Sequence, residues 1–215
     1  MKCDRIVRLS TLGSVIFAAG HISWADIQYT FTTLDVSGSS FVQANGINDS
    51  GQIVGDVGFQ GFLYQGGTVG IIDYPGSTNG TRVKGINSMG DIVGAYGPPA
   101  TGIDGFLYSG GTFTSIPYEA NGINDSGQIV GDFMGVSGFQ GFLDVGGTFT
   151  TITVPRADAT FAESINDNGQ ITGYYYIGAQ PNGFVDTNGV LTPIDVLGAD
   201  GTVALGINTK GEIAG

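Results

Sequence analysis

Apolar and polar residues alternate along the chain in short runs bounded by Gly, Asn, Asp and Pro, which is the pattern of half-buried β-strands. One ten-residue run, Gly46-Ile-Asn-Asp-Ser-Gly-Gln-Ile-Val-Gly55, recurs four more times with small changes. Its central asparagine lies at positions 48, 87, 124, 166 and 208, a spacing of about forty residues. A period of this length indicates stacked or radially arranged copies of one supersecondary unit. No segment after residue 25 shows a sustained helical period, so we predict no substantial helix there.

Each copy divides into four short predicted strands. The first ends in Gly-Ile-Asn, and a tight turn rich in Asp, Asn and Gly leads to the second, which reads Gln-Ile-Val-Gly or a close variant. A loop of variable length precedes a third strand that contains Gly-Phe-Leu. A Gly-Gly or Asn-Gly turn then leads to a fourth strand such as Thr112-Phe-Thr-Ser-Ile116. Pro75, Pro117 and Pro155 stand near the end of the fourth strand, where proline stops sheet pairing.

Four antiparallel strands in about forty residues predict an all-β fold, a β-propeller of four-stranded blades with about five repeat units, the last of them incomplete. Tyr29-Thr-Phe-Thr-Thr-Leu34 resembles a fourth strand, and we expect it to join the last unit, as ring closure in a propeller requires. The alternative is an open β-solenoid, which would expose a sheet edge at each end. The chain stops inside a motif at Gly215, so we expect a single β-repeat domain over 26–215 that is truncated at its C-terminal end.

The first 25 residues have a different pattern, that of a secretory signal peptide cleaved after Ala25. Basic residues precede an apolar run over 9–19, and a small residue ends the segment. The run is too short to span a bilayer, which takes about 20 residues. We therefore expect export to the extracellular space, with attachment to the cell surface as an option and no membrane insertion after cleavage.

Cleavage would also remove much of the chain's chemistry. The only cysteine, histidine and tryptophan are Cys3, His21 and Trp24, so a Ser-His-Asp triad, a Cys-His pair and a His/Cys zinc site are excluded in the mature chain. Three of the seven basic residues but only one of the nineteen acidic residues lie in this segment, so the mature chain is more acidic than the full sequence, whose net charge is −12. Nucleic-acid partners are not expected, because their binding depends on clustered Lys and Arg.

The repeated Gly-Ile-Asn-Asp-x-Gly-x-Ile-Val-Gly, followed by Phe-Leu-Tyr and Gly-Gly-Thr-Phe-Thr, resembles the HAF family of bacterial extracellular repeat proteins. The resemblance covers essentially all of the chain after residue 25, and it implies an exported bacterial repeat protein. The family is named for a His-Ala-Phe tripeptide before the third strand, of which this chain keeps only the phenylalanine. The corresponding positions read Gln60-Gly61-Phe62, Asp104-Gly105-Phe106, Gln140-Gly141-Phe142 and Asn182-Gly183-Phe184.

Loops that differ between copies are the predicted binding surface. In a propeller the loops between strands two and three share a face with the blade-to-blade connections, and variation there suits ligand recognition. The aromatic residues expected in these loops are Tyr96, Phe133, Tyr174, Tyr175 and Tyr176. We expect them to bind an extracellular glycan or a surface protein. The alternative is that they pack between blades.

Two chemical alternatives follow from the acidic residues. The Asn-Asp-x-Gly turns offer oxygen ligands for Ca²⁺. Each turn supplies one Asp and one Asn, however, whereas a calcium loop uses several carboxylates. Turn capping is therefore the preferred interpretation, and no cofactor or metal site is expected. A glycoside hydrolase or lyase-like enzyme would need an Asp/Glu pair at a suitable separation. No catalytic residue stands out among the acids. The predicted function is therefore a structural or recognition module, with the enzyme as the alternative.

Overall fold

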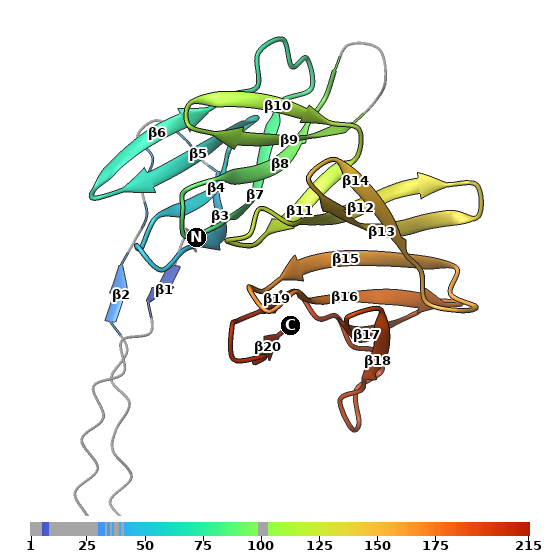
Figure 1. The fold of residues 1–215 in the computed structure, drawn as a ribbon. Helices are drawn as coiled ribbons and strands as arrows, with labels where there is room; N and C mark the ends of the chain where they lie inside the picture. The colour runs from blue at the N-terminus through green and yellow to red at the C-terminus, as the bar shows by residue number, and fades with distance from the viewer. Residues whose placement is uncertain are drawn as a thin grey trace, which may run out of the picture.

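The protein is an all-β propeller. The computed structural model describes residues 6–8, 30–32, 34, 36, 39, 41–98 and 103–215, and within them four antiparallel four-stranded sheets are arranged as blades (Figure 1). Apart from β1 (Ile6–Arg8), the predicted signal peptide lies outside the described residues. No helix occurs among the residues described, and none of them therefore forms one long and apolar enough to cross a membrane.

Each blade contains four strands that follow one another along the chain. The strands of the first blade are β3 (Val42–Ile47), β4 (Ile53–Val57), β5 (Gln60–Gln65) and β6 (Thr68–Ile72), and those of the second are β7 (Thr81–Ile86), β8 (Ile92–Tyr96), β9 (Asp104–Ser109) and β10 (Thr112–Ile116). The third blade contains β11 (Glu119–Ile123), β12 (Ile129–Gly135), β13 (Gly138–Val145) and β14 (Thr148–Ile152). The fourth contains β15 (Ala159–Ile165), β16 (Gln170–Ile177), β17 (Gln180–Thr187) and β18 (Val190–Ile194), and a fifth, two-stranded unit contains β19 (Gly206–Ile207) and β20 (Ile213–Ala214).

The first strands of successive blades lie side by side around a common axis. β3 contacts β7, β7 contacts β11, β11 contacts β15, and β15 contacts β19. The fourth strands lie on the outside of the arc (Figure 1). The blades therefore follow one another around the axis in chain order, as the forty-residue period predicted.

The expected partner of the segment 29–34 is not the one observed. β2 (Thr30–Thr32) pairs with β1, whereas β20 pairs with β19 and with no other strand among the described residues. The prediction that this segment supplies an outer strand to the last unit is therefore wrong for this structure. A Thr-Phe-Thr run is a general β-strand former, so its composition specifies a strand but not its partner.

The blade interior is built around the third-strand phenylalanine. Phe62, Phe106, Phe142 and Phe184 are fully buried, and each belongs to one blade. The ring lies over a second-strand glycine: a Cβ added to Gly131 would lie 2.8 Å from Cε1 of Phe142 and 1.9 Å from the Glu119 carbonyl oxygen. This glycine therefore allows the first strand and the phenylalanine to approach the second strand.

An asparagine ladder links all five units. The Asn48 side-chain amide donates to the main-chain carbonyl of Asn87, and Asn87, Asn124 and Asn166 each donate in the same way to the asparagine of the next unit, over 2.9 to 3.2 Å. The Oδ1 of each asparagine also accepts hydrogen bonds from main-chain N–H groups of its own turn, as Asn124 does from Ser126 and Gln128. One side chain thus closes the turn and joins two blades.

Replacing Asn124 with alanine should destabilise the fold strongly. Asn124 is 2% exposed, and its side chain makes hydrogen bonds to Gln128, to Ser126 and to the next blade. Because buried partners would be left unsatisfied, we expect a loss of about 3 kcal/mol in the free energy of unfolding, measured by urea titration. Asn208→Ala, at the exposed end of the ladder, should cost only ~1 kcal/mol. Equal losses in the two variants would contradict a role in joining blades.

Replacing Gly131 with alanine should also be costly, because the new Cβ would overlap the Glu119 carbonyl oxygen. We expect a loss of about 2–3 kcal/mol by the same titration, the usual cost of overpacking. Gly70→Ala is the matched control, since its Cβ would meet nothing closer than the Leu63 carbonyl oxygen at 3.8 Å. A neutral Gly131→Ala variant would show that the first strand can move away without cost.

Candidate functional site

A cavity of about 610 Å³ opens near the axis of the propeller. It lies on the face that carries the loops between second and third strands, because Gly58 and Phe59 from the β4–β5 turn line it together with Asn79 and Gly80 at the entry to β7. Hydrogen bonds join these two kinds of loop, from Thr81 N–H to the Phe59 carbonyl and from Thr78 N–H to the Gly97 carbonyl. The predicted sharing of one face by these connections is confirmed.

Irregularities in the first strands supply the cavity's central residues. In each complete blade the register between strands one and two shifts at one residue, which is Asn45, Lys84, Asn121 or Glu163. A bulge of this kind leaves the extra residue outside the ladder and redirects its side chain. All four residues line the cavity, as does Leu205 at the same sequence position of the fifth unit.

A hydrogen-bonded network occupies the wall formed by the second and third blades. The Lys84 ammonium forms an ion pair with Glu119 over 2.5 Å and donates to Asn121 Oδ1 over 2.7 Å. Asn121 Nδ2 then donates to Asp132 over 2.8 Å and to the Ala162 carbonyl over 3.0 Å. Lys84, Glu119 and Asn121 therefore hold one another in fixed positions across the blade boundary.

A similar network fixes the first blade. Asn45 Nδ2 donates to Asp56 Oδ2 over 3.0 Å and to the Val83 carbonyl over 2.7 Å, while Asp56 Oδ1 accepts the Val83 N–H. Burial raises the pKa of the Asp56 carboxyl, and these hydrogen bonds together with the charges of Arg82 and Lys84 oppose that rise. Asp56 is thus both a support for the blade boundary and part of the cavity wall.

Glu163 is a charged group of the site without a bonded partner among the described residues. Within the described chain its carboxylate accepts no hydrogen bond and forms no ion pair, although it is only partly accessible to solvent. Burial raises the pKa of Glu163, the Lys84 charge opposes this, and the nearby Asp132 and Glu119 carboxylates add to it. Burial likewise raises the pKa of Asp132. Several acidic groups therefore share one lysine.

Two exposed aromatic rings stand at the rim. Phe59 is 83% exposed and Phe41 is 54% exposed, and both line the cavity. Their exposed faces are available for contact with a ligand in the cavity. Arg82 and Gln43 lie beside them and add polar donors to the same rim.

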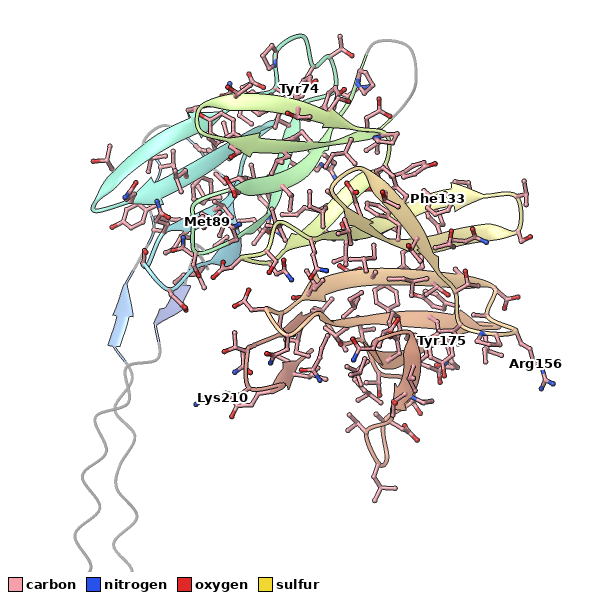
Figure 2. All side chains as sticks on the ribbon, in the orientation of Figure 1. Tyr74, Met89, Phe133, Arg156, Tyr175 and Lys210 are labelled. Carbon is pink, nitrogen blue, oxygen red and sulfur yellow. The ribbon has the colours of Figure 1, made fainter. Side chains whose placement is uncertain are left out.

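The aromatic residues that the sequence singled out lie in strands rather than in loops. Tyr96 ends β8, Phe133 belongs to β12, and the three tyrosines 174, 175 and 176 belong to β16. The expectation of loops at these residues is therefore wrong, because aromatic side chains favour strand structure and extend the hairpins. Tyr96 and Tyr175 are 8% exposed, and Tyr175 lies inside the fourth blade (Figure 2).

Stacking explains where these rings lie. Tyr96 stacks on Tyr74 of the preceding blade connection with ring centroids 3.6 Å apart, and Phe133 stacks on Tyr118 at 4.6 Å. Tyr174 stacks on Phe161 at 4.9 Å, and Tyr176 meets the same ring edge-on at 6.2 Å. The structure thus distributes the five predicted residues over three blades instead of gathering them on one surface.

Tyr174 is the member of this group whose pKa is affected by acidic residues of the cavity region. Burial raises the pKa of Tyr174 to about 12, and the carboxylates of Glu163 and Asp132 contribute to the rise. Its phenol therefore keeps its proton at neutral pH.

On the opposite face, the turn carboxylates cap main-chain groups. Asp125 accepts the Ser88 N–H over 2.7 Å, and Asp167 accepts the Asp125 N–H over 2.9 Å. These bonds support the preferred interpretation of the Asn-Asp turns as caps. The described residues contain no group of three His, Cys, Asp or Glu side chains that could hold a metal ion.

The residues of the axial cavity were missed in the sequence analysis, although a signal was present. The position before Gly-Ile-Asn, or Ser-Ile-Asn in the fourth unit, is Asn45, Lys84, Asn121, Glu163 or Leu205, so a variable residue stands directly before a uniform phrase of the repeat. Variation next to a fixed motif marks a side chain that the scaffold does not need. Comparison of the chain with protein-family models and with curated proteins gave no match.

Removing the Glu163 charge should stabilise the protein near neutral pH. Because the pKa of Glu163 is raised in the folded state, folding binds protons, and the free energy of unfolding falls as pH rises from the ordinary value of 4.5 through the raised value. Glu163→Gln should therefore raise Tm by about 2–4 °C near pH 7, with a smaller change below about pH 4. Calorimetry at both pH values measures this.

Asp49→Asn provides the control for Glu163→Gln, because Asp49 is exposed on the opposite face and its loss changes the net charge equally. A rise in Tm that is the same in both variants would reflect net charge and not the surroundings of Glu163.

Proposed function

We propose that this chain is an exported bacterial recognition module that binds a carbohydrate in the axial cavity. The observation that carries the proposal is the convergence of Asn45, Lys84, Asn121 and Glu163 from four blades on one cavity of about 610 Å³. Sites for small ligands commonly have volumes of roughly 300–1,000 Å³ and a few fixed polar groups. Bulged strands supply those groups here, and bulges are common beside binding sites.

The side-chain chemistry favours a sugar over an apolar ligand. Amides, carboxylates and cationic groups line the cavity, and they match the dense hydroxyl groups of a saccharide. Phe41 and Phe59 add exposed aromatic faces at the rim, where the apolar face of a sugar ring can stack. Most of the polar groups are already held by hydrogen bonds to neighbouring blades, so binding would order few of them.

Differences between blades give the cavity its asymmetry. The scaffold positions, such as the buried phenylalanines and the ladder asparagines, are uniform, whereas the bulge position changes from amide to ammonium to carboxylate. A ring of identical side chains would present the same group in every direction. The observed set offers one ligand several different contacts, which is what selective binding requires.

Export and family relationship complete the proposal. The basic start, the apolar run and the small residue Ala25 support a cleaved signal peptide, and the repeated Gly-Ile-Asn phrase supports a relationship to HAF repeat proteins. A recognition module outside the cell would meet extracellular or cell-surface glycans. Tyr174 does not line the cavity, although the charges of Glu163 and Asp132 act on it, and the five predicted aromatic residues support the blades.

Hydrolysis of a glycan is the second candidate function, and one observation favours it. A partly buried carboxyl with a raised pKa is a suitable general acid, and Glu163 lines the cavity together with a second carboxylate, Asp56. Chromatography of each bound glycan after prolonged incubation separates the two functions. Shortened products would identify an enzyme, whereas recovery of intact glycan supports recognition.

Phe59→Ala should weaken glycan binding without loss of stability. A glycan array identifies a ligand, and calorimetric titration then compares variants. Because Phe59 is 83% exposed at the rim, we expect about tenfold weaker binding, which equals ~1.4 kcal/mol, with an unchanged Tm. Met89→Ala is the matched control, since Met89 is 71% exposed on the turn between β7 and β8, away from the cavity. An array without hits, or full affinity in Phe59→Ala, would count against the proposed site.

A further inference from the structure

We propose that the ligand of the axial cavity is a saccharide bearing a protonated amine, which binds beside Glu163. This inference rests on the proposed function and names the ligand class for the same site. It follows from the charges of the wall formed by the second, third and fourth blades. Those charges do not balance among themselves.

Lys84 is the cation that acts on three carboxylates in this wall, whereas the charge of Arg82, which also lines the cavity, acts on Asp56 of the first blade. Lys84 forms an ion pair with Glu119 over 2.5 Å, and its charge also acts on Asp132 and on Glu163. Glu119 comes from β11, Asp132 from β12 and Glu163 from β15, so the acidic groups approach from two blades. With all three ionised, the wall carries an excess of negative charge that a second cation would reduce.

Glu163 is the group that lacks this second cation. Asn121 donates to Asp132, and Lys84 pairs with Glu119, but the structure gives the Glu163 carboxylate no donor within the described chain. Withdrawing a carboxylate from water without a donor is unfavourable, and a charge-assisted hydrogen bond offsets that cost. Glu163 lines the cavity, so a ligand held there can supply the donor.

An ammonium group suits this position better than a metal ion. The described residues provide no cluster of three acidic, His or Cys side chains that could hold a metal, which agrees with a wall whose other carboxylates are already bonded. An ammonium carries three N–H donors and one positive charge. It can bond Glu163 and leave the remaining contacts of the sugar to Asn45, Arg82 and the rim phenylalanines.

A pair of sugars that differ only in the amine tests the inference. The probes are the β-1,4-linked glucosamine tetramer and its fully N-acetylated form, titrated calorimetrically at a pH where the free amine is protonated. We expect the wild type to bind the amine form at least about tenfold more tightly, the gain of one charge-assisted hydrogen bond. Glu163→Gln should abolish this preference, because the amide carries no negative charge.

Controls separate the site from general charge. Asp49→Asn removes one exposed acid on the opposite face and should keep the preference. Asn45→Ala, in the cavity but on the first blade, should weaken both sugars by a similar factor. If Glu163→Gln did not fold, wild-type titrations at falling pH replace it: the preference should shrink as Glu163 takes up a proton. The charged groups that act on Glu163 are Lys84, Asp132 and Glu119, and Tyr174 stays neutral because its pKa is raised to about 12.

The outcomes distinguish this inference from the function on which it rests. Equal affinity for the two tetramers, or a preference that survives in Glu163→Gln, would contradict the proposal that an amine binds beside Glu163. If neither tetramer binds but another glycan on the array binds in a Phe59-dependent way, the proposed amine ligand is wrong and carbohydrate recognition is still supported. An array without any hit overturns both.

Discussion

The fold depends on one repeated hydrogen bond, from an asparagine amide to the main-chain carbonyl of the asparagine in the next blade. The same side chain closes its own turn through Oδ1, so turn geometry and blade spacing are set by a single residue. Because the ladder asparagines of the second to fourth blades lie in the interior, each bond forms where water does not compete. The glycine beside the ladder lets neighbouring first strands approach, as Gly85 does with Asn121 and Gly122.

The site follows from this arrangement. The ladder and the buried phenylalanines fix the inner strands, and a bulge then directs one extra side chain per blade toward the axis. That side chain contributes little to the fold, so it is free to differ between blades. Glu163 shows the consequence for stability: it keeps a carboxylate where burial disfavours it, which is a common feature of binding and catalytic sites.

Much of the fold could be predicted from the sequence because its signals are local and repeated. Strand composition, glycine turns and a period of about forty residues identify a propeller without any knowledge of long-range contacts. The site could be predicted less well. Whether the side chains of Tyr96 and Tyr175 face solvent depends on the length of each hairpin and on the ring against which each tyrosine packs. The repeat sequence encodes neither the hairpin length nor the packing partner. The partner of β2 was missed for the same reason, since strand pairing between distant segments has no local signal.

The ladder is directional, and its ends differ. Among the described residues, Asn208 donates to Glu212 in its own turn and to no further unit, and no side-chain amide of a preceding unit donates to the carbonyl of Asn48. Each blade boundary therefore repeats one interaction in one sense, and the stability of the whole resembles a sum over nearest neighbours. In evolutionary terms such a chain can gain or lose a blade by duplication or deletion of one repeat, because every new boundary reuses a contact that already exists.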